Sequence, residues 1–131
     1  MGEACIKSME IVVESIHLVN NYLPMGEFRI LPKIQKRIAT NLENENAFKL
    51  DMVVELKNTE ENPFPIDLKV EISGIFELEG GDLSEKMEFL NNQGVKMVYP
   101  YLRSLVSSIT ANSNIPPITL PIINVQNFID R

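Results

Sequence analysis

The residue types that most often carry chemistry are sparse in this chain. His17 is the only histidine and Cys5 the only cysteine among 131 residues. His17 falls in an alternating apolar segment, which favours a spacer on a strand over a general base. A single cysteine cannot form an internal disulfide or a metal cluster. The sequence therefore predicts no catalytic residue, and we expect the protein not to be an enzyme.

The remaining charged and glycine residues follow structural patterns. No histidine or cysteine spacing suits a metal ion, and no glycine loop suits a phosphate, so we expect no metal and no cofactor. The formal net charge of -6 argues against nucleic acid and anionic membrane as main partners. No apolar run is long enough to insert in a membrane and no signal peptide is recognisable. We expect one domain, residues 1–131, in the cytoplasm.

Four strands are predicted in the first 79 residues. Residues 64–79 alternate most clearly, since apolar residues occupy every second position from Ile66 to Leu78. Gly74 falls on the apolar side, where we expect another backbone to approach closely. Residues 48–57 alternate in the same way. Residues 9–19 change phase near Glu14, which predicts a β-bulge.

The apolar spacing of residues 28–42 fits a strand and a helix equally well. Pro32 disfavours a helix interior and favours an edge strand. Lys33, Lys36 and Arg37 give this strand a basic patch. A charged edge that blocks pairing with other sheets is one interpretation. An acidic partner is the other.

Helices are predicted only after residue 81. The first covers about residues 82–92 and ends at Gly94. The second covers 95–111, with Pro100 in its first turn. Proline-rich residues 116–121 follow, and Asn124 caps a last helix that carries Val125, Phe128 and Ile129. The predicted class is α+β, a four-stranded antiparallel sheet with helices packed on one face.

Some apolar residues do not fit this two-sided pattern. Tyr22, Leu23 and Met25 lie in a predicted loop over residues 20–27, and Val53 and Ile75 lie on the polar face of the sheet. The loop residues either plug the sheet edge or face a ligand. As a set, such residues indicate an oligomer interface or a groove for apolar segments.

With these elements placed, the chain resembles the SecB family of export chaperones. The resemblance rests on Gly74-Ile75-Phe76, Tyr99-Pro100-Tyr101, Ile109, Pro116-Pro117, Leu120-Pro121, Asn124 and Phe128. It implies an ATP-independent holdase that binds unfolded or aggregation-prone polypeptides and assembles as a homotetramer, a dimer of dimers. Protein export is one role that the resemblance implies. A dedicated antitoxin client is an alternative. A second alternative is an oligomeric scaffold for one folded partner.

The resemblance also implies particular site residues. The client-binding set is Tyr22, Leu23, Phe28, Phe76, Tyr99, Leu120 and Ile122. For each of these, ordinary core packing is the competing interpretation. Asp67, Glu71 and Glu77 form the partner-docking set on the outer sheet face. Lys69 stands among them where the family's surface for the SecA ATPase is acidic, which weighs against SecA docking.

Overall fold

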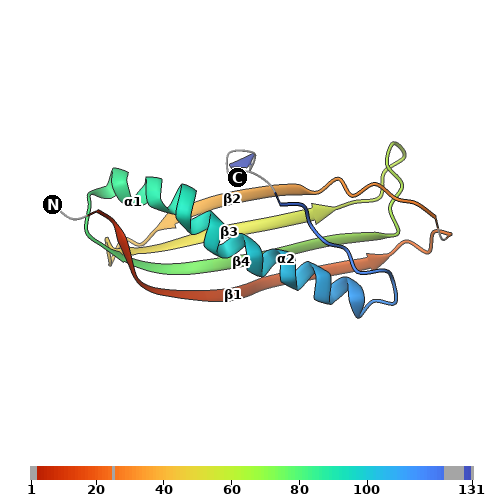
Figure 1. Cartoon of the computed structure of the whole chain (residues 1–131), viewed down its shortest axis with the longest axis horizontal. Coiled ribbons are helices and arrows are strands. Elements are labelled where there is room, and N and C mark those ends of the chain that lie inside the picture. Colours follow the sequence, from red (N-terminus) through yellow and green to blue (C-terminus); the bar gives the residue numbers. More distant parts are fainter. Residues whose placement is uncertain (1–2, 25, 123–128, 131) are drawn as a thin grey trace.

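The chain folds as one antiparallel sheet crossed on one face by a long helix. The computed structural model describes residues 3–24, 26–122 and 129–130. Its strands are β1 (Cys5–Asn20), β2 (Lys33–Thr40), β3 (Ala47–Leu56), β4 (Ile66–Glu79) and β5 (Ile129–Asp130), and its helical segments are α1 (Leu83–Phe89), η1 (Leu90–Gly94) and α2 (Val95–Ala111). The sheet order is β1-β4-β3-β2-β5 (Figure 1). The predicted α+β class is confirmed.

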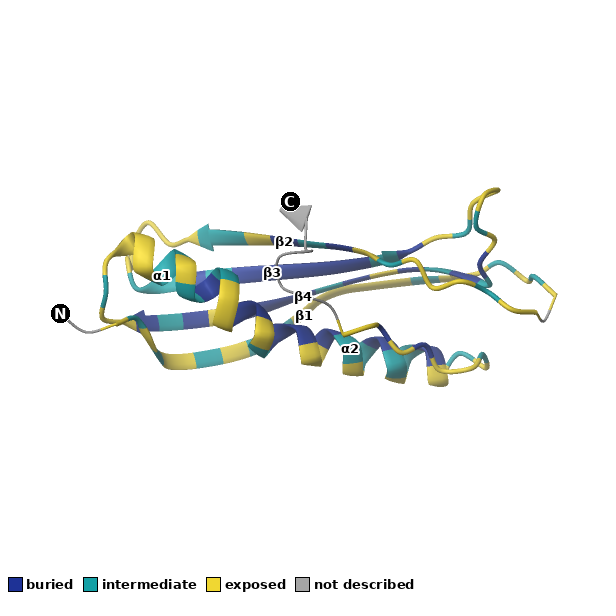
Figure 2. Cartoon of the chain, turned by 45° about the horizontal axis from the view of Figure 1, so that its top comes forward, coloured by how far each residue is buried: buried dark blue, intermediate teal, exposed yellow. Residues whose placement is uncertain are grey.

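The helix side of the sheet carries the core. Along β4, residues Ile66 to Leu78 on the apolar parity are buried, as the alternation predicts. Val98, Leu102 and Val106 of α2 pack against them. Figure 2 shows this buried band running along β3 and β4 beneath the helix. The helix therefore covers the two central strands.

Gly74 allows this close packing. A Cβ at Gly74 would lie 2.6 Å from Val98 Cγ2 and 2.7 Å from Phe76 Cε2. The approach that we expected is real, but the neighbours are side chains of α2 and β4 and not another backbone. The predicted bulge is confirmed, because the β1–β4 register shifts between Val13 and Ser15.

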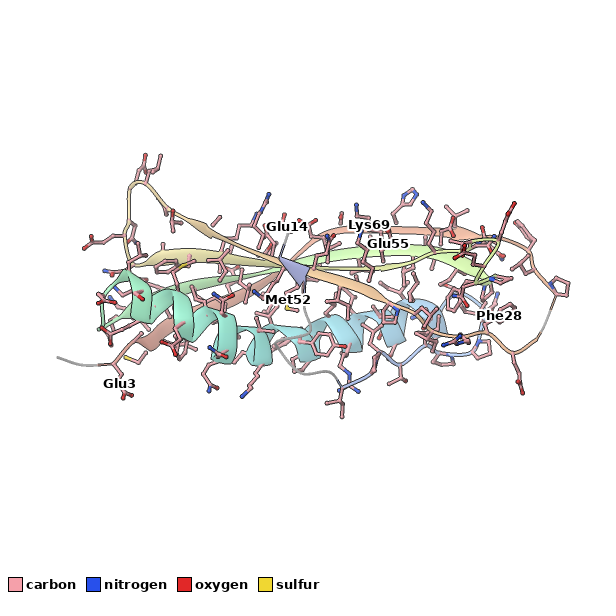
Figure 3. All side chains as sticks on the ribbon, turned by 90° about the horizontal axis from the view of Figure 1, so that it is seen from above. Glu3, Glu14, Phe28, Met52, Glu55 and Lys69 are labelled. Atoms are coloured by element: carbon pink, nitrogen blue, oxygen red, sulfur yellow. The ribbon has the colours of Figure 1, made fainter. Side chains whose placement is uncertain are left out.

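The outer face of the sheet is more buried at its centre than the alternation suggests. Asp51, Val53 and Ser73 point away from the helix, yet they are 1%, 3% and 0% exposed. Ser73 Oγ donates a 2.6 Å hydrogen bond to Asp51, and Arg37 Nη2 lies 3.0 Å from the same carboxylate. Lys49 Nζ also lies 3.7 Å from the Asp51 carboxylate. In Figure 3, Glu14, Glu55 and Lys69 lie on this outer side, opposite the helix.

The predicted second strand is too long. Residues 28–32, including Pro32, lie outside strands, and β2 covers only Lys33–Thr40. The proline has no backbone donor, so it precedes the ladder. On its other side, β2 also pairs in parallel with β5 at Gln35 and Lys36, a strand that the sequence did not indicate.

The two predicted helices are one continuous helical rod. Gly94 is not a stop: its φ is -58°, and it belongs to the π-helical turn η1 that joins α1 to α2. A Cβ there would lie 3.4 Å from Leu50 Cδ2, so the glycine fits the helix closely onto β3. Pro100 accordingly lies inside α2 and not in a first turn. Asp82 caps the N-terminus in a capping box with Glu85.

The segment after α2 returns along the helix as an extended strap, residues 115–122. Side chains at four positions of α2 hold it: Tyr99 Oη, Arg103 Nε and Ser107 Oγ donate to the carbonyls of Pro121, Leu120 and Ile118, and Thr110 Oγ1 accepts from Ile118 N–H. Prolines supply no N–H for a strand ladder, so side chains bind the strap instead.

The last predicted element, the helix from Asn124, can be compared with the structure only at its end. Most of the helix expected from Asn124, including Val125 and Phe128, lies outside the described residues. Ile129 is not helical, because it pairs with Gln35 as part of β5. Within the described chain, no helix is long and apolar enough to span a membrane, and no cluster of side chains suits a metal ion.

Candidate functional site

A cavity of about 340 Å³ lies where the β1–β2 loop meets the end of α2. Its lining is mostly apolar, and it combines two segments far apart in sequence. The lining residues are Asn20, Tyr22, Leu23, Pro24, Gly26, Phe28, Pro65, Asn114, Ile115 and Pro116. Three of the residues predicted to bind a client, Tyr22, Leu23 and Phe28, therefore line one cavity, which we call the loop groove.

Tyr22 is held in an unusual backbone conformation that turns its ring into solvent. Its φ is 53°, in the left-handed region that bulky residues seldom adopt. The Asn20 side chain accepts a 2.7 Å hydrogen bond from Tyr22 N–H and so stabilises this turn. The Tyr22 side chain is left 86% exposed. Backbone strain of this kind is concentrated at functional sites, so Tyr22 stays a candidate for client binding.

The loop is fixed at both ends. Asn21 N–H donates to Pro65 O at 2.9 Å, and Asn21 Nδ2 donates to Phe64 O at 3.1 Å and to Asp67 Oδ1 at 3.2 Å. At the other end the Phe28 ring packs edge-on against Phe64, with centroids 6.1 Å apart. The groove is thus largely formed before any ligand binds, which lowers the ordering cost of binding.

The opposite wall of the groove lies just after α2 and consists of Asn114, Ile115 and Pro116. The client residues predicted in this part of the chain, Leu120 and Ile122, do not line the groove. Asn114 has a φ of 59° just after α2 and reverses the chain, which brings Ile115 to the β1–β2 loop. An asparagine after a helix end is the sequence signal for such a reversal.

Four predicted client residues lie elsewhere. Phe76 and Leu120 are 0% exposed and belong to the core, so in this conformation they cannot contact a client. Tyr99 is 7% exposed and donates a 2.6 Å hydrogen bond to Pro121 O. Burial raises the pKa of Tyr99 above its ordinary value, while nearby Arg103 lowers it. Ile122 is 85% exposed but does not line the groove.

The three residues of the predicted docking set have structural partners. Asp67 Oδ1 accepts hydrogen bonds from Asn58 N–H and from the Asn21 side chain. Glu77 lies 3.7 Å from Lys7 Nζ, and Glu71 is half-buried beside Val53. Asp67 thus helps to hold the β1–β2 loop, which lines the loop groove, in place. Whether these residues dock a partner stays a prediction.

A larger hollow of about 490 Å³ lies at the far end of the sheet, beside the β2–β3 turn. Leu42, fully exposed, and Ile75, 40% exposed, are its accessible apolar residues. It contains none of the predicted client residues. Leu42 therefore offers a matched exposed leucine for testing the loop groove.

Comparison with known proteins identifies the sequence family. The family model described as "Preprotein translocase subunit SecB" matches residues 14–130. The uncharacterized protein MJ0357 of Methanocaldococcus jannaschii is 31% identical over 131 residues, covering 96% of this chain and 83% of the relative.

Export proteins of the same family match over a shorter stretch. The protein-export protein SecB of Xylella fastidiosa is 33% identical over 95 residues, covering 71% of this chain and 55% of that protein. The protein of the same name from Ruegeria pomeroyi is 31% identical over 85 residues, covering 65% and 50%. These matches span about half the length of the export proteins.

One solved structure has a similar fold. It is the Mycobacterium tuberculosis Rv1957 SecB-like chaperone, in complex with a ChAD peptide from the Rv1956 HigA1 antitoxin. The TM-score is 0.76 at 18% identity, and the likeness covers 93% of this chain and 91% of that one. At this identity the likeness shows the fold alone, and it confirms the SecB-like arrangement of sheet and helix.

Proposed function

Because this chain belongs to the SecB family, we propose that it is an ATP-independent holdase chaperone that binds unfolded or aggregation-prone polypeptides. The observation that carries the proposal is the loop groove, a preformed apolar hollow with Tyr22 exposed at its rim. No cofactor and no catalysis are part of this function, and its setting is the cytoplasm.

Binding in the loop groove is driven by burial of apolar surface. A client side chain the size of leucine or phenylalanine gains about 1.5–3 kcal/mol when fully buried. One such contact gives weak binding, which suits a holdase that must release its client. Several grooves in one oligomer raise the affinity, because a client held at one groove has a high effective concentration at the next.

The affinity of a substituted protein for an unfolded client tests this site. In Tyr22→Ser/Leu23→Ser the groove loses its ring and its leucine. We expect affinity for a reductively unfolded model protein to fall roughly tenfold to a hundredfold, since each 1.4 kcal/mol is tenfold. The matched control, Leu42→Ser, removes an equally apolar exposed side chain at the other end of the sheet and should retain full affinity.

The outcomes of this test separate the alternatives. Equal affinity of the double variant and the native chain would remove the loop groove from the site. Loss in the Leu42→Ser control alone would move the site to the hollow beside the β2–β3 turn.

A homotetramer is part of the proposal, and the open edge of β1 supports self-association. β1 is one of the two outer strands of the sheet that the structure describes, and its Val13 and Ile16 are 50% and 48% exposed. Their register partners, Ile72 and Val70, are buried on the helix side, so both residues lie on an apolar face that α2 leaves uncovered. Pairing of two β1 edges would cover them.

Clients are proposed as a class. General unfolded polypeptides are the first choice, and a dedicated antitoxin is the alternative, which a toxin–antitoxin gene pair beside this gene would favour. Docking of SecA is not proposed: Asp67 is engaged by Asn58 and Asn21, and Lys69 is exposed among the acids of the outer face.

A further inference from the structure

We propose that the edge of β2 that faces β5 is a second binding site, at which an extended client segment adds to the sheet as a strand in place of the chain's own Ile129–Asp130. This inference rests on the proposed function, because it concerns how a client is held. Its first support is direct: the edge already accepts a strand, since β5 pairs in parallel with β2 at Gln35 and Lys36 (Figure 1).

Two of the three basic residues of β2, Lys36 and Arg37, have partners on the faces of the sheet. Lys36 is 8% exposed on the helix side, and its Nζ donates a 2.7 Å hydrogen bond to Asn91 Oδ1 of η1. The Arg37 guanidinium lies on the outer face, 3.0 Å from buried Asp51. Two of the three cations expected to block strand pairing are therefore tied to the faces of the sheet. For Lys36 and Arg37 the charged-edge interpretation stays a prediction, and their partners lie on the two faces of the sheet.

The edge is also regular enough to accept a strand. β2 pairs with β3 over eight consecutive residues without a register shift, and the strand contains no proline. An unpaired, regular edge presents a row of backbone donors and acceptors to another chain. By contrast, β1 has two register shifts, after Ile6 and after Val13.

The described residues of the tail, those of β5, pair with part of this edge. β5 is two residues long and pairs with Gln35 and Lys36, whereas β2 extends to Thr40. A longer client strand would form more backbone hydrogen bonds and displace the tail. In strand addition the affinity comes from backbone hydrogen bonds, so client segments with different side chains can bind. This suits a chaperone with many clients. A client segment rich in proline could not pair with β2, because proline has no backbone N–H to donate to the strand ladder.

Amide hydrogen exchange of β2 tests the proposal. The probes are a valine- and threonine-rich octapeptide and a matched peptide with proline at alternate positions. In a chain that ends after Phe128, we expect β2 amides that face β5 to exchange roughly tenfold faster, the scale of one net hydrogen bond. The octapeptide should restore protection and the proline peptide should not.

Two variants of full length complete the experiment. Ile129→Gly/Asp130→Gly keeps the length of the tail but weakens its strand preference, and it should behave like the shortened chain. Ile129→Val should behave like the native chain. Unchanged β2 exchange in the shortened chain, or equal protection by both peptides, would overturn the proposal. Failure of the holdase function would appear separately, as no suppression of aggregation by the full chain.

Discussion

Gly74 is the position where a single methyl group is expected to matter most. In Gly74→Ala the new Cβ would lie 2.6 Å from Val98 Cγ2 and 2.7 Å from Phe76 Cε2, inside the contact between β4 and α2. Overpacking of this kind costs about 1–3 kcal/mol of unfolding free energy. Gly26→Ala, whose Cβ would meet nothing within 4 Å, is the control. Equal stability of both variants in urea would contradict the packing described.

Tyr99 gives the chain an alkaline dependence of stability. Its pKa is raised by burial, so the folded state keeps the phenol protonated where the unfolded chain ionises. The contribution is complete below about pH 10, the ordinary pKa of tyrosine, and is lost as the pH rises through the higher folded pKa.

Tyr99→Phe checks this dependence. It should cost about 0.5–1.5 kcal/mol at neutral pH, through loss of the hydrogen bond to Pro121 O, and should flatten the alkaline decline. Tyr101→Phe, half-exposed, should leave the unfolding free energy within about 0.5 kcal/mol. Urea unfolding at pH 7 and pH 10.5 measures both, and an equally steep decline in Tyr99→Phe would contradict the assignment.

At the scale of elements, the strap depends on Thr110. Thr110 Oγ1 donates to Val106 O and accepts from Ile118 N–H, both at 2.8 Å, in a site with no exposure. Thr110→Val keeps the shape but leaves the Ile118 N–H without its acceptor, a cost of about 1–3 kcal/mol. Exposed Ser104→Ala is the control. Faster amide exchange of Ile118 would accompany the loss, and native-like exchange would contradict it.

The elements also show what a sequence can and cannot predict here. The alternation in β4 is enough to predict its buried face, because one side packs on α2 and the other is mostly solvated. Glycine and proline normally end helices, so the continuity through Gly94 and Pro100 was missed. It depends on close tertiary contact with β3, which local sequence does not contain. β5 was missed for the same reason.

The candidate site was half predictable. Tyr22 and Leu23 stand out because apolar residues are unusual in a loop, and the structure places both at the groove. Ile115 does not stand out in the sequence, and Pro116 stands out only as part of the proline-rich segment. The reversal at Asn114 is what brings both to that loop. Phe76 and Leu120 were chosen by resemblance, and burial places them in the core.

At the scale of the whole molecule, self-association is expected to depend on the β1 edge. In Val13→Glu/Ile16→Glu, carboxylates replace two half-exposed apolar side chains of β1, an outer strand of the described sheet. We expect the oligomer to dissociate toward monomers, since burying unpaired charges is costly. Sedimentation velocity measures the change. The control is Leu42→Glu, which also replaces an exposed apolar side chain with a carboxylate but lies away from β1. An unchanged sedimentation coefficient would exclude the β1 edge from the interface.

The holdase proposal is tested most directly by one comparison of affinities. The native chain is titrated with a model protein that is reductively unfolded and, separately, with the same protein in its native form. The loop groove takes exposed apolar segments, which the native form buries. We therefore predict that the unfolded form binds and that the native form binds at least about a hundredfold more weakly, a difference of about 2.7 kcal/mol. Equal affinity for the two forms would contradict the chaperone function.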